Sequence, residues 1–302
     1  MSVFLRALPP LLRVGSAIAP SAMASLAWRM FRSPRDLDKP VSAREERLRD
    51  AAQTERIVSG TYEDAVEIQL YRWPAAAGTT TPGASPKTAL LVHGWEGDAL
   101  NFVAFVGPLR KAGFDVVALD GPAHGASSGE RTDALRHAQA IEAVIQHLGQ
   151  VDLLVGHSFG GYACAFAVAG IPGLIEPQAV GRLVLIAAPD TFEGVFHRFA
   201  QMVGFSEAVE RRIHRRVEAM GGQPASRFSV RHALGLIDVP TLVIHDRDDK
   251  EIPFAEGETN GAAGPHVTFH PTNGLGHRRI LRAPDVVQHL IAFGKTEAVA
   301  LP

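Results

Sequence analysis

Short apolar runs recur along the chain and alternate with segments in which apolar positions return every three or four residues. Runs this short, apolar on both faces, are typical of buried parallel strands, whereas the three-four spacing is typical of amphipathic helices. The spacing predicts a helix over 134–148. The predicted strands are Ala89–Val92, Val116–Leu119, Leu153–Val155, Leu183–Ile186, Leu242–Ile244 and Val267–Phe269. The alternation predicts an α/β fold, with a mostly parallel, doubly wound sheet.

A different pattern precedes these strands. Residues Ala65–Trp73 alternate strictly between apolar and polar, and together with Arg56–Val58 they predict an antiparallel pair at one edge of the sheet. A charged stretch, Ala43–Thr54, is predicted to be helical.

A third pattern interrupts the core. Residues 191–238 contain no strand signal, and their charged stretch Ser206–Met220 has helical spacing. We therefore expect a helical cap at 191–238, an α/β core at 55–190 and 239–302, and a separate N-terminal helical segment at 1–54. The charges of Glu210–Arg212 and of Arg215 and Arg216 are expected to face solvent. The cap also supplies apolar side chains that either pack the cap onto the core or line a pocket: Phe192, Phe196, Phe199, Met202, Val203 and Phe205.

The composition argues against several classes of protein. The 302 residues carry 30 basic and 32 acidic side chains, so nothing indicates a nucleic-acid partner. A single cysteine, Cys164, excludes an intramolecular disulfide and is expected to be a small buried residue. The sequence contains no His-x-His cluster, and we expect neither a metal nor a cofactor.

The N-terminal segment leaves three interpretations open. Residues 1–32 contain arginines but no acidic residue, and Met23, Leu26, Ala27 and Met30 fall on one face of a helix that should end before Pro34. This helix packs on the domain, associates weakly with a membrane surface, or belongs to a cleaved signal, although prolines interrupt the apolar stretch that a signal needs. A cytoplasmic location is expected, with membrane association and export as alternatives.

The most informative segment is 151–161, where an apolar run ends in Gly156-His157-Ser158-Phe159-Gly160 and a helix is expected from Gly161 to Ala169. A serine at a tight strand-to-helix turn adopts a strained backbone, and the flanking glycines leave room for neighbouring elements. The hydroxyl is then presented at a helix N-terminus, where negative charge is favoured. Ser158 is therefore a candidate nucleophile.

Candidate partners of Ser158 follow other strands, at the sheet edge where sites of such folds lie. His93-Gly94-Trp95 follows the first core strand, and the backbone N–H groups of Trp95 and Phe159 could stabilise an oxyanion. His277, behind two glycines, is the candidate base. The turn after Ile244 offers three acids to orient it, Asp246, Asp248 and Asp249, and two of these are expected to be solvated or to cap a helix.

Other polar residues near these motifs are assigned no catalytic role. The His93 side chain is expected to bind a nearby backbone group, and His157 to point away from the serine. Asp120–Gly125 is interpreted as a structural turn at the rim of the site. His266, His270 and His289 lack a suitable loop.

Taken in order, these motifs resemble the α/β-hydrolase superfamily over residues 55–295. The resemblance rests on His93-Gly94-Trp95, Asp120–Gly125, Gly156–Gly160, Asp249-x-x-Ile252-Pro253 and Gly276-His277. The family pattern Asp-x-x-Val/Ile-Pro favours Asp249 as the acid, with Asp248 as the alternative. His245-Asp246 stands where that family commonly has His-Gly.

The resemblance implies a serine hydrolase with Ser158, Asp249 and His277 as its catalytic triad and Trp95 and Phe159 as its oxyanion hole. The implied substrate is a small molecule, a carboxylic ester or similar acyl compound, and the apolar side chains of the insertion favour a medium-sized, hydrophobic one. Two alternatives stay open: the same triad used for carbon–carbon cleavage, thioester hydrolysis or acyl transfer, and a non-catalytic binding protein on this scaffold.

Overall fold

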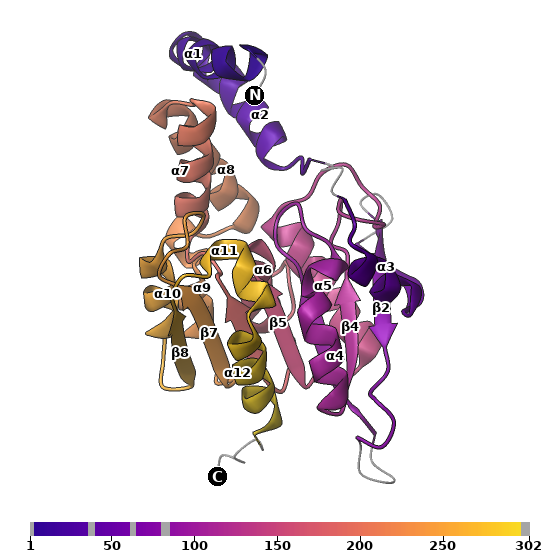
Figure 1. Ribbon diagram of the computed structural model, residues 1–302. Helices are drawn as coiled ribbons and strands as arrows, with labels where there is room; N and C mark the ends of the chain where they lie inside the picture. The colour runs from indigo at the N-terminus through magenta and orange to yellow at the C-terminus, as the bar shows by residue number, and fades with distance from the viewer. Residues whose placement is uncertain (1–2, 36–39, 61–64, 80–84, 297–302) are drawn as a thin grey trace.

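The computed structural model describes residues 3–35, 40–60, 65–79 and 85–296, with side chains from residue 10 onward (Figure 1). The described residues form a sheet of eight strands in the order β1-β2-β4-β3-β5-β6-β7-β8. The strands are β1 (Gln53–Ser59), β2 (Val66–Trp73), β3 (Lys87–Val92), β4 (Phe114–Leu119), β5 (Leu153–His157), β6 (Leu183–Ile186), β7 (Thr241–Asp246) and β8 (Val267–Thr272). Strand β2 is antiparallel to both of its neighbours, and the remaining neighbours are parallel. The predicted fold class, including the antiparallel edge, is confirmed.

Helices cover both faces of this sheet. One face packs against α5 (Ala134–Leu148), α6 (Phe159–Ala169) and α9 (Val230–Leu234), and the other packs against α4 (Val103–Lys111) and α12 (Pro284–Lys295). Because successive side chains of a strand point to opposite faces, Leu154 joins the first core and Val155 the second. This two-sided burial is the reason that segments such as Ala89–Val92 and Val116–Leu119 are apolar at successive positions.

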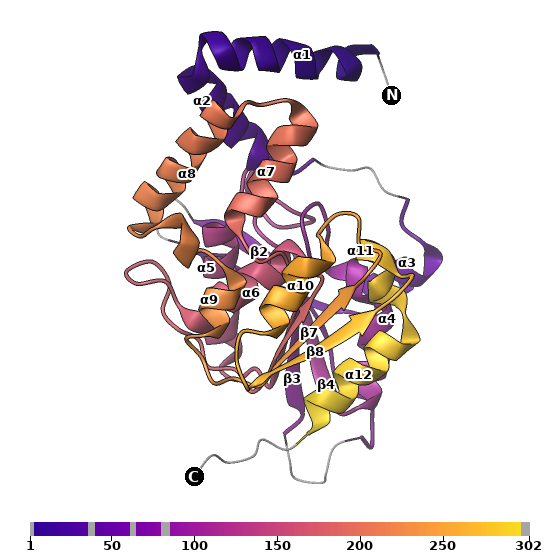
Figure 2. The same cartoon turned by 90° about the vertical axis from the view of Figure 1, so that its left-hand side faces the viewer.

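A third core lies beyond the sheet edge, among four helices that gather at one end of the molecule (Figure 1, Figure 2). These are α1 (Val3–Ile18), α2 (Pro20–Phe31), α7 (Phe192–Val203) and α8 (Glu207–Gly221). Ala27 of α2, Phe196 of α7 and Val209 of α8 are fully buried together. The N-terminal segment and the insertion, which the sequence suggested as separate units, therefore share one apolar core.

The helix predicted to end before Pro34 is α2, and α1 precedes it. Two local predictions were wrong. The charged helix predicted over 43–54 is α3 (Ala43–Asp50), and Gln53 already belongs to β1. Glu210, expected in solvent, is 6% exposed because its carboxylate accepts a hydrogen bond from His197 Nδ1 at 2.9 Å. A buried acid with a partner is not recognisable from the charge pattern around it.

Two further helices follow the insertion: α10 (Phe254–Gly261), which packs between α9 and the β7–β8 edge, and the short α11 (Gly276–Arg279). None of the helices in the described part of the chain combines the length and apolar character that a membrane span requires.

Candidate active site

Ser158 occupies a sharp turn between β5 and α6. Its φ is 52° and its ψ is −123°, a conformation that non-glycine residues rarely adopt. A Cβ atom on Gly160 would lie 2.3 Å from the carbonyl oxygen of His93, and one on Gly156 would lie 2.6 Å from the Cα of Gly161. Both glycines are thus required by close backbone contacts, as the sequence suggested. Helix α6 begins at Phe159, two residues earlier than predicted, so Ser158 sits directly at its N-terminus.

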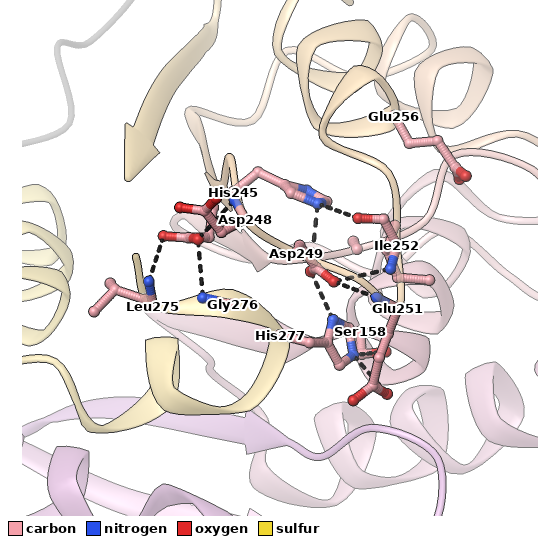
Figure 3. A network of polar contacts seen from close by, with 12 residues as sticks. Ser158, His245, Asp248, Asp249, Glu251, Ile252, Glu256, Leu275, Gly276 and His277 are labelled. Atoms are coloured by element: carbon pink, nitrogen blue, oxygen red, sulfur yellow. Dashed lines mark hydrogen bonds and ion pairs between the residues drawn. The ribbon is translucent and has the colours of Figure 1, made fainter. Parts of the chain in front are cut away.

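The structure brings Ser158, His277 and Asp249 together from three separate strand ends (Figure 3). His277 Nε2 lies 2.9 Å from Ser158 Oγ, and His277 Nδ1 lies 2.7 Å from Asp249 Oδ2. The Asp249 side chain is fully buried and that of His277 is 7% exposed. Asp248, the alternative acid, makes no contact with His277 in the described structure.

The environment of Asp249 favours its charged form. Burial alone would raise the pKa of Asp249, but hydrogen bonds outweigh it and hold that pKa below its usual value. They come from His277 and from the backbone N–H groups of Glu251 at 2.8 Å and Ile252 at 2.9 Å. A carboxylate at this position keeps the His277 proton on Nδ1, which leaves Nε2 free to accept the proton of Ser158.

Two neighbouring aspartates hold the loop that carries His277. Asp246 is fully buried and accepts hydrogen bonds from the N–H groups of Leu275 at 3.1 Å and Gly276 at 2.8 Å. Its carboxylate also accepts from the Thr272 hydroxyl at 2.7 Å. Asp248 is exposed and accepts from Gly274 N–H at 2.8 Å. The expectation that these two acids are solvated or cap a helix was wrong for Asp246, because its partners lie almost thirty residues away.

His157 contacts His277, which the sequence did not reveal. Its Nε2 donates to the backbone carbonyl of His277 at 2.9 Å, and the two rings lie 4.9 Å apart. Burial, and then the proximity of His277, lower the pKa of His157 to about 3, so this ring stays neutral. His157 therefore supports the backbone of His277 without replacing it as the neighbour of Ser158.

The loop after β3 packs directly on the serine turn. A Cβ atom on Gly94 would lie 3.0 Å from the Cβ of Ser158, and the ring of Trp95 meets that of Phe159 edge-on at 5.2 Å. The N–H groups of Trp95 and Phe159 bind no other described residue. His93 is structural: its Nδ1 donates to the Gly94 carbonyl and its Nε2 accepts from Gly121 N–H.

A cavity of about 1760 Å³ opens onto Ser158 and His277. Of the apolar side chains predicted in the insertion, Phe192, Phe199, Met202 and Val203 line it, whereas Phe196 and Phe205 are buried between helices. Trp28, Met30 and Phe31 of α2 also line the cavity. The first fifty residues, which carry none of the motifs, thus contribute to the site. The described residues form no cluster of three or more groups suited to hold a metal ion.

Comparison with known proteins agrees with this geometry. Residues 88–226 match the sequence profile of the family described as alpha/beta hydrolase fold. The chain belongs to the α/β-hydrolase superfamily. Within this superfamily, the chain is 28% identical over 245 residues to a 2-hydroxy-6-oxononadienedioate/2-hydroxy-6-oxononatrienedioate hydrolase from Cupriavidus pinatubonensis, a match covering 65% of this chain and 82% of that protein.

Two further members extend the comparison. A bifunctional esterase/perhydrolase from Acinetobacter calcoaceticus is 28% identical over 242 residues, which cover 64% of this chain and 83% of that enzyme. The crystal structure of a thermophilic esterase from Thermogutta terrifontis matches with a TM-score of 0.55 at 20% identity, over 80% of this chain and 98% of that one. The structural match shows the shared α/β-hydrolase fold.

Proposed function

We propose that this α/β-hydrolase cleaves carboxylic esters through an acyl-enzyme formed on Ser158. The observation that carries the proposal is the continuous relay from Ser158 Oγ to His277 Nε2 at 2.9 Å and from His277 Nδ1 to Asp249 at 2.7 Å. A nucleophile, a base and an orienting acid at these distances are the parts that acyl transfer requires.

The reaction proceeds in two halves. His277 Nε2 takes the proton of Ser158 as Oγ bonds to the ester carbonyl carbon, and the carbonyl oxygen becomes an oxyanion. When the carbon–oxygen bond to the alcohol breaks, His277 returns that proton to the departing alkoxide. Water then attacks the acyl carbon and gives one proton to His277. His277 returns this proton to Ser158 Oγ as the bond between Oγ and the acyl carbon breaks and the carboxylic acid leaves.

The N–H groups of Trp95 and Phe159 are the proposed oxyanion hole. Both are free of other described partners, and the Gly94 loop brings the first of them against the serine turn. Phe159 N–H also lies at the N-terminus of α6, where the helix favours negative charge. Preorganised donors of this kind stabilise the charge that develops in the transition state.

The lining of the cavity favours an ester over a dicarboxylate substrate. The relative named for the hydrolysis of dienedioates acts on compounds with two carboxylates. Here the walls formed by α2 and α7 are mainly aromatic and aliphatic, and a carboxylate placed against Phe31 or Phe199 would lose its hydration. The proposed substrate is accordingly a hydrophobic acyl compound.

The exposed face of α1 supports a second proposal, that the protein associates weakly with an anionic lipid surface. Leu11, Val14 and Ile18 lie on one face of α1 and are 68%, 58% and 78% exposed. Residues 1–35 carry five arginines and no acidic residue. An apolar helix face in a basic segment is suited to the interface of anionic lipids, and binding to lipid vesicles tests this.

Labelling with a tagged fluorophosphonate tests the nucleophile. Wild-type protein is expected to be labelled and to hydrolyse p-nitrophenyl esters, whereas Ser158→Ala should lose labelling and roughly 10⁶-fold of kcat. Ser226→Ala, which changes an exposed serine, is the matched control and should behave as wild type. Ester hydrolysis at the wild-type rate by Ser158→Ala would exclude the proposed mechanism.

A further inference from the structure

Helix α2 forms a wall of the active-site cavity although it lies outside the sheet and its covering helices. Trp28, Met30 and Phe31 line the cavity on the side of α2, and Phe192 and Phe199 line it on the side of α7. The opposite side of α2 is anchored in the third core, where Ala27 has no exposed surface. The wall is therefore part of a packed layer rather than a loose terminal segment.

Phe31, the last residue of α2, lies at the centre of an aromatic cluster. Its ring contacts Phe192 at 5.8 Å, Phe196 at 5.2 Å and Phe199 at 5.3 Å, all edge-on. The same ring stacks on Trp95 at 6.4 Å, beside the proposed oxyanion hole. Phe31 thus connects the helical layer to the reacting centre through contacts that an acyl chain would share.

Two ion pairs hold this end of α2 against the core. The Arg35 guanidinium donates to both oxygens of Glu96, at 2.7 and 3.0 Å, and Glu96 directly follows Trp95. Arg32 pairs with the buried side chain of Asp133 at 2.8 Å, and the Arg32 carbonyl accepts a hydrogen bond from Thr132 N–H at 2.9 Å. Because both tethers directly follow Phe31, they hold the end of α2, and with it the Phe31 ring, in the wall of the cavity that contains Ser158.

The size and character of the cavity indicate its ligand. Pockets for small drug-like ligands measure roughly 300–1,000 Å³, and this cavity measures about 1760 Å³. Met202 lines it and is 73% exposed, so the cavity reaches the surface at the end of α7. A large cavity that is mainly apolar along α2 and α7 and open at its far end accommodates a long, flexible hydrocarbon chain on that side.

We propose that α2 and α7 together form the binding site for the long acyl chain of the substrate, and that Phe31 contacts this chain. The inference rests on the proposed ester hydrolysis at Ser158 and names the substrate class of that site, long-chain acyl esters. The N-terminal segment is then a determinant of acyl-chain length.

The test compares p-nitrophenyl butyrate with p-nitrophenyl palmitate, and Phe31→Ala with wild type. Wild type should prefer palmitate, and Phe31→Ala should lower the palmitate-to-butyrate ratio of kcat/KM about tenfold, mainly through KM. Phe31→Leu, which preserves the packing of α2, should lower the ratio less. Phe205→Ala is the matched control, because this ring belongs to the same helical layer but does not line the cavity.

A binding measurement separates this inference from the proposed reaction. In the Ser158→Ala background, palmitate is expected to change the fluorescence of Trp28 and Trp95, whose rings lie 6.5 and 6.4 Å from that of Phe31. The added Phe31→Ala change should weaken palmitate binding about tenfold, and Phe205→Ala should not.

The outcomes are distinct. A wild-type protein that is labelled by fluorophosphonate but prefers butyrate, or equal losses in Phe31→Ala and Phe205→Ala, would overturn the acyl-site inference and leave the hydrolase proposal standing. Palmitate binding that depends on Phe31 in a protein without any esterase activity would instead overturn the proposed reaction and retain the acyl site.

Discussion

At the scale of single residues, three aspartates in one turn have three different environments. Asp249 contacts His277, Asp246 holds the backbone of the loop that carries His277, and Asp248 makes one exposed contact to that loop. We expect Asp249→Asn to lower kcat about 10⁴-fold, because the amide favours the wrong tautomer of His277. Asp246→Asn should lower kcat about tenfold to a hundredfold and also lower the melting temperature, since it removes charge-assisted hydrogen bonds.

Asp248→Asn serves as the matched control and should remain within a few-fold of wild type, because this side chain is exposed. Steady-state kinetics give kcat for each of the three variants, and thermal unfolding gives the melting temperature. A larger loss in Asp248→Asn than in Asp249→Asn would assign the orienting acid to the other aspartate.

At the scale of elements, helix α5 buries a histidine with no polar partner. Both ring nitrogens of His137 lack hydrogen bonds within the described structure, and the rings of His93 and His124 lie 5.7 and 6.0 Å away. Burial, and then His124, lower the pKa of His137 to about 3. In the unfolded chain the His137 ring binds a proton below about pH 6.5, whereas in the folded protein it stays neutral until the pH approaches 3. The contribution of His137 to the free energy of unfolding is therefore complete above pH 6.5 and decreases as the pH falls toward 3.

We therefore expect His137→Phe to reduce the acid sensitivity of the free energy of unfolding, by about 2 kcal/mol between pH 7 and pH 5. Urea unfolding of variant and wild type at several pH values measures this difference. The comparison must be between the two proteins, because burial raises the pKa of Asp120 to about 6 and acts in the opposite direction over part of the same range. Parallel pH curves for the two proteins would contradict the prediction.

The elements themselves were largely predictable from the sequence, for a physical reason. Local periodicity defines a strand or an amphipathic helix, and 134–148 coincides with α5 because one face of that segment is apolar throughout. The partners of a buried polar side chain depend instead on distant segments. Neither the contacts of Asp246 with Leu275 and Gly276 nor the contact of His157 with His277 has any signature in the neighbouring residues.

At the scale of the whole molecule, the candidate site combines segments that are far apart in the chain. Glycine and histidine motifs located Ser158 and His277 because each follows a strand, but the packing of α2 on α7 and α8 could not be predicted from its composition. The sequence pattern of α2 suits a helix buried on a domain as well as one on a lipid surface. Tertiary packing, which buries Ala27 and Trp28, decides between these for α2 but leaves one face of α1 exposed.

That exposed face leads to a prediction for the intact protein. We expect it to co-sediment with vesicles that contain phosphatidylglycerol, more weakly with vesicles of phosphatidylcholine alone, and less in high salt. Replacing Leu11 and Ile18 by serine should weaken binding about tenfold or more. The control replaces Val58 and Leu236, which are 64% and 61% exposed elsewhere, by serine. Equal binding of the two double variants would contradict a role for α1.

The packing of α2 on the insertion also sets an order of events during synthesis. Helix α2 leaves the ribosome long before α7 and α8, its partners at residues 192–221, have been translated. The apolar side of α2 therefore stays exposed to solvent while most of the sheet is being synthesised, and we expect chaperones to bind the nascent chain during this time. The cavity wall closes only after this delay, so the last part of the site to assemble includes a helix that is synthesised before the sheet.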